Sequence, residues 1–309
     1  MYLTGIPFGF SSLATESKTW SKATGRINLD WTPNEDTLVY LSYTTGYRAG
    51  GYGLGTLDAR SLTGAVFNSI YSYDEEEVAH TELGFKGTFA DGTLQLFSSI
   101  YRYQYDGYQD SVTVYDDVQA AYQTLPTNTG SAVNQGWEVE GTWLATDELT
   151  INANYSLTNT EYQDEIFLLE DDNPLAPVPL YGTKAHNLKG SSLKGIPEHK
   201  FTTWANYRFD LADSTLVVAA YYSFTGEYNS ESIDREFDKM PARHQTDASI
   251  IWNSGDGLLT VRGYVDNLFD ARNFRSLSAG GLGNNYMLTG TLLRTRSFGL
   301  DITRRFGQG

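Results

Sequence analysis

The 309-residue chain contains no cysteine, which excludes both a disulfide framework and a cysteine-based metal site. It has no run of about 18 apolar residues, so a transmembrane helix is excluded as well. Basic residues are few, with 22 Lys and Arg against 38 Asp and Glu, and the net charge is −16. Because phosphodiester backbones would repel this acidic chain, we expect no nucleic acid among its partners.

Proline is also scarce, at 8 residues, whereas the chain has 22 Tyr, 15 Phe, 6 Trp and 30 Gly. Aromatic residues favour strands and glycine favours turns, so this composition predicts an all-β protein. Residues 1–12 contain neither a basic segment nor an apolar core, so we expect no signal peptide there. A secreted or outer-membrane protein needs one, and under those interpretations we expect the chain to begin within a longer protein.

Apolar and polar residues alternate with a period of two in eleven segments, the pattern of strands with two unlike faces. In residues 149–159, for example, Ile151 and Leu157 share one face while Asn152 and Asn154 share the other. The fourth segment is ambiguous, because apolar residues fall on both of its faces. The predicted strands are residues 22–31, 37–47, 80–89, 93–105, 134–145, 149–159, 200–210, 215–224, 242–252, 258–267 and 293–306.

The connections between these segments alternate between short and long. The short ones are rich in Asp, Asn, Gly, Pro or Ser, as tight turns require. They are residues 32–36, 90–92, 146–148, 211–214 and 253–257. The long ones are residues 48–79, 106–133, 160–198, 226–241 and 268–292. Antiparallel up-and-down strands would therefore place every tight turn at one end of the sheet and every long loop at the other.

This asymmetry is typical of transmembrane β-barrels, whose strands span the bilayer with about 9–11 residues. In such a barrel charged side chains face a wet lumen and aromatic side chains ring both interfaces. The charged residues on the polar faces are Arg26, Asp30, Glu82, Lys86, Glu138, Glu140, Arg208, Asp247, Arg262, Asp266, Asp301 and Arg305. The aromatic residues near strand ends include Trp31, Tyr47, Phe89, Tyr105, Phe209, Phe224 and Trp252. A soluble β-sandwich would show the same alternation, with its apolar faces packed together, and stays open as an alternative.

Six stretches resemble, in their order along the chain, the barrel of TonB-dependent outer-membrane receptors. The two C-terminal ones are "VDNLFDARNF" at 265–274, similar to the penultimate strand, and "RSFGLDITRRF" at 296–306, similar to the last strand with its terminal aromatic at Phe306. The other four are residues 40–53, 75–109, 128–156 and 196–209.

The resemblance implies an all-β, antiparallel transmembrane barrel of 22 strands, filled by a plug, of which these eleven strands would be the C-terminal half. Residues 1–21 would then be the tail of an extracellular loop, 22–306 barrel, and 307–309 a short tail that follows Phe306, the signal for the barrel-assembly machinery. The plug, the TonB box and the first strands would lie outside this chain. Eleven strands leave two open edges, so we expect the chain by itself not to form a stable barrel.

The function implied by the resemblance is high-affinity uptake of a scarce ligand across the Gram-negative outer membrane, most often a ferric siderophore, with energy from the TonB complex and no catalysis or cofactor. The five long loops would capture the ligand, although no individual contact residue can be named. A passive porin-like barrel and a soluble carbohydrate-binding β-protein are the alternatives.

Other candidate sites carry weaker signals. Acidic clusters at 74–77 and 170–172 could hold calcium or ferric iron through oxygen ligands, but they lack an EF-hand spacing and are expected to be solvated loops. The glycine-rich residues 50–55 lack the Lys-Ser/Thr of a phosphate loop and are expected to be a flexible loop. The aromatic run at 100–108 could stack on rings or sugars, but cross-strand packing is the expected role. No zinc-binding or catalytic motif joins the four histidines, His80, His186, His199 and His244.

Overall fold

The computed structural model of the chain describes residues 17–60, 66–116, 121–170, 184–232, 239–279 and 288–306. These described residues form strands, turns and irregular segments but no helix. The all-β class predicted from composition is therefore confirmed.

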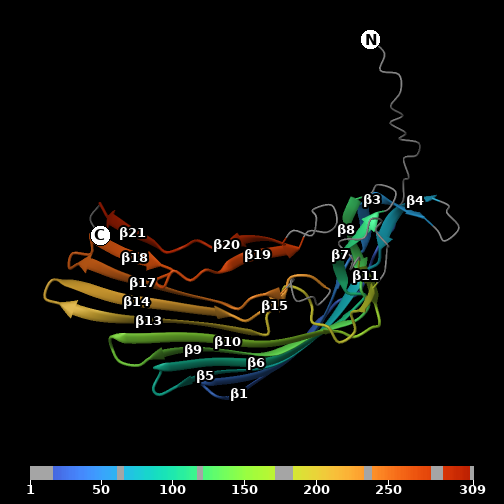
Figure 1. Cartoon of the computed structure of the whole chain (residues 1–309). Coiled ribbons are helices and arrows are strands. Elements are labelled where there is room, and N and C mark those ends of the chain that lie inside the picture. Colours follow the sequence, from blue (N-terminus) through green and yellow to red (C-terminus); the bar gives the residue numbers. More distant parts are fainter. Residues whose placement is uncertain are drawn as a thin grey trace, which may run out of the picture.

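One large sheet of eleven antiparallel strands dominates the structure, and neighbours in the sheet are neighbours among its strands along the chain (Figure 1). This is the predicted up-and-down meander. The sheet curves into an open trough with β1 and β21 at its two edges, and these edges do not pair with each other. Its strands are β1 (Arg26–Asn34), β2 (Thr37–Arg48), β5 (Glu76–Phe89), β6 (Leu94–Asp106), β9 (Ala132–Leu144), β10 (Leu149–Tyr162), β13 (His199–Leu211), β14 (Ser214–Thr225), β17 (Arg243–Ser254), β18 (Leu259–Asp266) and β21 (Ser297–Arg304).

Each of the five long connections contains a two-stranded antiparallel sheet, which the prediction of plain loops missed. The pairs are β3 (Gly51–Arg60) with β4 (Val66–Tyr73), β7 (Gln109–Asp116) with β8 (Ala121–Asn128), β11 (Phe167–Glu170) with β12 (Lys184–Asn187), β15 (Tyr228–Asn229) with β16 (Lys239–Met240), and β19 (Phe274–Ala279) with β20 (Leu288–Leu292). The glycine-rich residues expected to be a loop begin β3, where the register shifts between Tyr52 and Thr56. Glycine allows this irregular pairing because it has no side chain to obstruct it.

Several predicted strand ends were wrong. The pairing of β1 with β2 continues up to Asn34, whose partner is Thr37. The first turn is therefore shorter than the predicted 32–36. The final segment, 293–306, is not one strand, because pairing with β18 begins only at Ser297, while Leu288–Leu292 pairs with β19. The alternation of apolar and polar residues does not mark where a strand stops pairing with its neighbour. The observed ends of β1, β20 and β21 are set by this pairing.

The apolar faces of the eleven strands share one side of the sheet, and nothing in the described residues covers them. The register aligns apolar side chains across neighbouring strands in rows, such as Leu83, Ile100, Trp137 and Leu157. Leu300 and Ile302, on the edge strand, are each 66% exposed. A soluble sandwich would bury such a face against a second sheet, and this structure has no such layer among its described residues.

The opposite side of the sheet is polar and carries tyrosines that lie over glycines of the next strand. Tyr40 lies over Gly84 and donates a hydrogen bond to Glu82. Tyr101 lies over Gly136 and shares a hydrogen bond of 3.1 Å with Thr158. Glycine leaves the space that each ring occupies, so rings and glycines together form the polar face.

Gly136→Ala should destabilise the sheet. A Cβ at this position would lie 2.2 Å from the backbone oxygen of Leu157 and 2.7 Å from the Tyr101 hydroxyl, so both strands would have to shift. We expect a loss of about 1–3 kcal/mol in the free energy of unfolding, the usual cost of overpacking. Guanidinium titration of the protein in detergent micelles, followed by tryptophan fluorescence, measures it.

Gly263→Ala is the matched control, because Gly263 also lies within a strand but a Cβ there meets no atom within 4 Å. Equal unfolding midpoints for the Gly136 variant and the unchanged protein would contradict the packing argument.

Candidate functional site

The long connections begin at one end of the sheet, and a buried carboxylate, Asp110, joins three of them. Asp110 is 8% exposed. Its Oδ2 accepts hydrogen bonds of 2.7 Å from the Tyr162 hydroxyl and from the Ser232 hydroxyl, and its Oδ1 lies 2.7 Å from Lys194 Nζ. Lys194 also donates to the backbone oxygen of Ser111 at 2.6 Å. This loop-base cluster (Asp110, Tyr162, Lys194 and Ser232) therefore connects β7 with the segments that follow β12 and β15.

A small apolar core supports the loop-base cluster. Ala132, Tyr162, Leu188 and Leu193 are buried together, and the backbone N–H of Leu193 donates to Thr160 Oγ1 at 3.0 Å. Four partly buried residues pack around them: Tyr105, Tyr108, Ile166 and Ile196. The main burial of apolar side chains in the described residues is thus at the loop end, where it fixes the bases of the connections.

The polar contacts of Asp110 keep it ionised. Burial by itself would raise the pKa of this carboxyl, but the hydrogen bonds from Lys194, Ser232 and Tyr162 outweigh it and lower the pKa below its usual value. Burial, and next the nearby Asp110 charge, raise the pKa of Tyr108 to about 12, so its hydroxyl stays protonated. The cluster is therefore a fixed set of donors around one negative charge.

A row of tyrosine rings leads along the polar face of β6 to this cluster. Successive ring centroids are 5.3 to 6.2 Å apart. The rings are Tyr101, Tyr103, Tyr105, Tyr108 and Tyr162. His80 of the next strand stacks on Tyr103 with centroids 4.0 Å apart, which is the cross-strand packing expected for this aromatic run. Ile100 and Arg102 of the same run lie on the apolar face instead.

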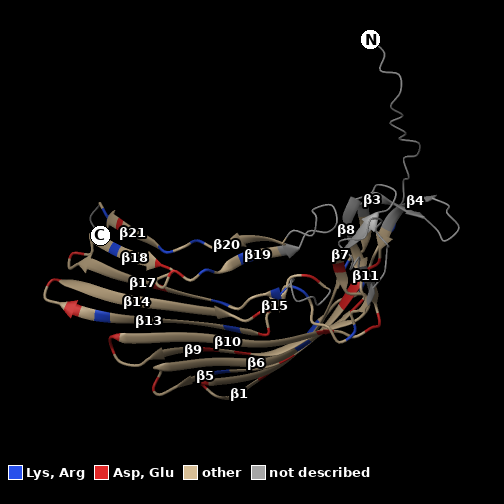
Figure 2. Cartoon of the chain, viewed as in Figure 1, with Lys and Arg blue, Asp and Glu red and all other residues tan. Residues whose placement is uncertain are grey.

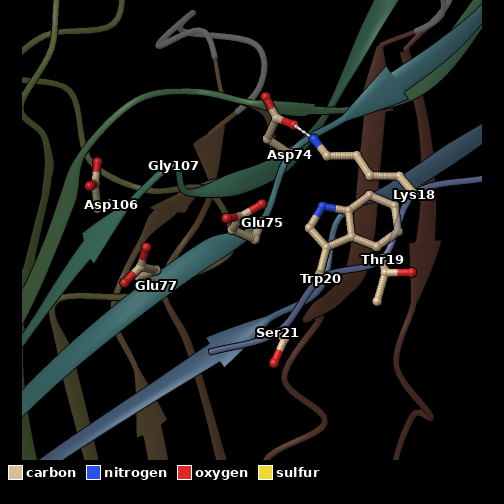
Figure 3. Close-up of a pocket in the computed structure, with 9 residues that line it drawn as sticks. All are labelled: Lys18, Thr19, Trp20, Ser21, Asp74, Glu75, Glu77, Asp106 and Gly107. Carbon is tan, nitrogen blue, oxygen red and sulfur yellow. Dashed lines mark hydrogen bonds and ion pairs between the residues drawn. The ribbon is translucent and has the colours of Figure 1, made fainter. Parts of the chain in front are cut away.

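The predicted acidic cluster at 74–77 borders an open pocket of about 510 Å³ at the loop end (Figure 3). Lys18 pairs with Asp74, and Lys22 pairs with Glu77 and lies 3.7 Å from Glu75. The pocket is lined by Lys18, Thr19, Trp20, Ser21, Asp74, Glu75, Glu77, Asp106 and Gly107. Ammonium groups thus satisfy part of the negative charge, and the segment at 17–21 lies against the loops. Most of the second predicted cluster, 170–172, falls outside the described residues.

The histidines do not form a site. They lie on four different strands: His80 on β5, His186 on β12, His199 on β13 and His244 on β17. His199 is hydrogen-bonded to the Tyr155 hydroxyl at 2.8 Å on the apolar face. Across the described ranges, no group of three or more His, Asp or Glu side chains is arranged to bind a metal ion. The same ranges contain no helix with the length and apolarity needed to cross a membrane.

Phe306, the predicted assembly signal, lies two residues after the end of β21. Its ring is exposed and lies 5.8 Å from the guanidinium carbon of Arg304.

Comparison with known proteins identifies the family. Residues 4–268 match the family described as TonB dependent receptor-like, beta-barrel. The chain belongs to the TonB-dependent receptors. Members are receptors of the outer membrane rather than enzymes. This match confirms the family that the sequence stretches resemble.

Individual receptors are similar to this chain over most of its length. The ferric-pyoverdine M114 receptor PbuA of Pseudomonas sp. strain M114 is 25% identical over 288 residues, which are 90% of this chain and 30% of that receptor. The ferric yersiniabactin uptake receptor FyuA of Yersinia pestis has a TM-score of 0.68 at 17% identity, over 92% of this chain and 37% of its own. The siderophore receptor PiuA of Acinetobacter baumannii has a TM-score of 0.63 at 19% identity, over 91% of this chain and 35% of its own. The chain therefore spans about a third of the length of these receptors.

Sequence patterns did not reveal the loop-base cluster of this TonB-dependent receptor chain. Tyr162 and Ser232 lie 52 and 122 residues from Asp110 along the chain. Asp110 follows a predicted strand in a polar loop and has no motif around it. Tyr162 lies past the predicted end of its strand and on the polar face, in step with Asn152 and Asn154, so alternation does not single it out.

Asp110→Asn should loosen the bases of the loops while leaving the sheet intact. The amide keeps the shape of the carboxylate but removes the charge that Lys194 pairs with. Since hydrogen bonds to a charged group contribute about 1.5–3 kcal/mol, we expect amide exchange in residues 188–196 and 228–232 to accelerate tenfold or more. Hydrogen–deuterium exchange with mass spectrometry measures it.

Asp256→Asn is the control, because Asp256 occupies an exposed tight turn at the opposite end, where its Oδ1 accepts from Leu258 N–H. Unchanged exchange at 188–196 in the Asp110 variant would refute the proposed support of the loops.

The loop-base cluster should also respond to acid in a defined direction. Because the pKa of folded Asp110 lies below its usual value of 3.8, its stabilisation is complete above that pH and is lost as the pH falls through the lowered pKa. The loops should open only in the lower part of the range from about pH 5 to about pH 2, where Asp110 becomes protonated. Limited pepsin digestion at stepped pH values detects this opening as cleavage within the loops. Asp110→Asn should be cut equally at every step, and a parallel pH dependence in that variant would assign the effect to other carboxyls.

Proposed function

We propose that this chain forms part of the wall and mouth of an outer-membrane receptor that imports a ferric siderophore. The observation that carries the proposal is the similarity, over 90% of the chain, to a receptor named for ferric pyoverdine. The two structural neighbours described above support the fold; one is named for ferric yersiniabactin and the other as a siderophore receptor. Residues 22–306 would belong to the barrel and 1–21 to an extracellular loop.

The dimensions of the exposed apolar face support a position in the bilayer. A polar row closes it on the loop side, formed by Thr81, Arg102, Gln135 and Asn159 on adjacent strands. On the turn side it reaches Trp143, which lies between Leu94 and Ile151. From Gln135 to Trp143 a strand advances about 26 Å, or about 20 Å along the membrane normal at a tilt of about 40°, comparable with the apolar band of about 25 Å in transmembrane barrels.

The two open edges support a larger barrel. β1 and β21 leave unpaired backbone groups, which hydrocarbon does not tolerate. Eleven further strands would close the sheet at 22. A plug inside the closed barrel would contact the polar face and connect it to the TonB complex, and the exposed Phe306 would serve the barrel-assembly machinery.

The loop end is the proposed ligand-capture surface. It carries the five two-stranded sheets at 48–79, 106–133, 160–198, 226–241 and 268–292, and the loop-base cluster positions three of them. Aromatic and hydroxyl groups at this end can contact an organic chelate that already surrounds its iron. The iron is cargo, so the protein needs no metal site of its own.

Uptake of radioactive iron tests the proposal. A strain without its own siderophore receptors, carrying the receptor that contains this chain, is offered ferric pyoverdine, ferric yersiniabactin and a ferric catecholate in turn under iron limitation. We expect saturable uptake of one class, lost in a strain without TonB. Uptake that neither saturates nor needs TonB would favour the passive porin-like alternative instead.

A variant in which residues 109–128 are replaced by a short Gly-Ser turn tests the mouth. It should reach the outer membrane in normal amount but lose most binding of the ferric siderophore, because it removes β7, β8 and Asp110 together. A variant with the 211–214 turn replaced in the same way serves as the control at the other end. Full binding after removal of 109–128 would place the ligand elsewhere.

A further inference from the structure

Four arginines gather beside the edge strand in a chain that is otherwise acidic. Residues 268–296 contain Arg272, Arg275, Arg294 and Arg296 but only one acidic residue, Asp270, whereas the whole chain has a net charge of −16. Figure 2 shows the corresponding blue segments on β19 and on the stretch that leads from β20 into β21. We call these four residues the arginine patch.

Backbone contacts bring the arginine patch together. Leu293 N–H donates to the Asn273 backbone oxygen at 2.8 Å. Arg272 directly precedes Asn273 and Arg294 directly follows Leu293, so this bond brings the two arginines near each other. Arg275 follows Phe274, which is paired with Leu292, and Arg296 N–H donates to Asp270 Oδ1 at 2.9 Å. Residues separated by about twenty positions in sequence therefore present their charges from one small area.

Much of this positive charge is not neutralised. All four arginines are exposed. Arg272 Nη2 lies 3.7 Å from Asp270, and Arg296 Nη1 donates to the Leu268 oxygen at 3.3 Å. Within the described residues, the side chains of Arg275 and Arg294 form neither a hydrogen bond nor an ion pair.

The patch borders the apolar face rather than the polar one. The guanidinium carbon of Arg296 lies 5.9 Å from the ring of Phe298, which is 75% exposed and shares its face with Leu300. Other large exposed apolar residues in the same stretch are Phe269, Leu288 and Leu292. Arginines with apolar neighbours of this kind are typical of the boundary between hydrocarbon and headgroups.

The register places Arg296 close to the membrane level of Gln135, one residue of the polar row described above. Paired residues lead from Phe298 across six strand-to-strand steps to Trp143 on β9. With strands about 4.8 Å apart, residues about 3.3 Å apart and a tilt of about 40°, the membrane plane shifts by about one residue per strand. Six steps shift the plane by about six to seven residues, which brings Phe298 level with Trp137 or Gly136 and Arg296 within about one residue of Gln135.

We propose that the arginine patch binds the phosphate groups of a lipid headgroup in the outer leaflet. Guanidinium groups form paired hydrogen bonds with phosphate, and the neighbouring apolar side chains would contact the acyl chains of the same lipid. A soluble anion would bind the guanidinium groups but would make no apolar contact with Phe298 or Leu292. The proposal rests on the membrane position proposed above, but not on the identity of the imported ligand.

Lipid titration tests this proposal. The receptor that contains this chain is purified in neutral detergent and titrated with diphosphorylated lipid A, and native mass spectrometry measures the bound fraction. Each basic residue near an anionic lipid surface contributes about a fivefold factor in affinity, so Arg275→Gln, Arg294→Gln and Arg296→Gln together should weaken binding about a hundredfold. Dephosphorylated lipid A should bind the unchanged receptor as weakly as the phosphorylated lipid binds the triple variant.

Arg304→Gln is the matched control. Arg304 ends β21 at the turn side, with its guanidinium carbon 5.8 Å from the Phe306 ring, and the adjacent Arg305 is engaged by donating to the Gly257 oxygen at 3.2 Å. Its loss should leave lipid A binding unchanged. If the triple variant does not fold, as judged by heat-modifiable migration on a gel, Arg294→Gln should still weaken binding about fivefold.

Two results would overturn the proposal. Equal affinity of the unchanged receptor and the folded variant for lipid A would exclude phosphate recognition by the patch. Displacement of the lipid by inorganic phosphate at equal concentration would assign the patch to a soluble anion. A receptor that imports no ferric siderophore but still distinguishes the two lipids would refute only the proposed transport function.

Discussion

A strand in contact with hydrocarbon must pair every backbone N–H and C=O, because no water is present to accept or donate a hydrogen bond. The strand pairing of this chain meets that requirement everywhere in the large sheet except at its two edges. Eleven strands pair in sequence order with long, nearly uninterrupted registers, and the tight turns between them are only a few residues long. The same requirement makes the free edges of β1 and β21 the least stable feature of the sheet in a membrane, and it is the physical reason to infer further strands beside them.

The two faces of the sheet follow different rules of packing. The apolar face is exposed row after row, and in the proposed membrane position its side chains would need only to match the lipid in polarity and length of span. The polar face is more closely fitted, with tyrosines over glycines of the next strand and tyrosine hydroxyls bonded to Glu82 one strand away and to Thr158 two strands away. A closed barrel would enclose this face, so its close fit is consistent with contact to a plug.

The loop end combines apolar burial with a paired buried charge, and both restrict motion of the mouth. Asp110 accepts hydrogen bonds from residues that belong to different connections, so the loops share one anchor instead of moving independently. A ligand that contacts any one of these connections could therefore affect the others through the same carboxylate. The arginine patch lies outside this anchor, beside the apolar face, and its proposed role concerns the lipid rather than the imported ligand.

The sequence by itself determined the strands, their up-and-down order and the distinction between turn end and loop end. Period-two alternation and Asp-, Asn- and Gly-rich turns are local signals, and pairing of neighbours along the chain needs no distant information. It also carried the family, through short stretches in a fixed order. It did not predict the hairpins within the long loops, the end of β20 and start of β21, or the partners of Asp110. Those depend on residues as far apart as Asp110 and Ser232, which only the folded chain brings within 2.7 Å. Tertiary structure decided them because a polar side chain in a loop carries no local mark of the group it will bond.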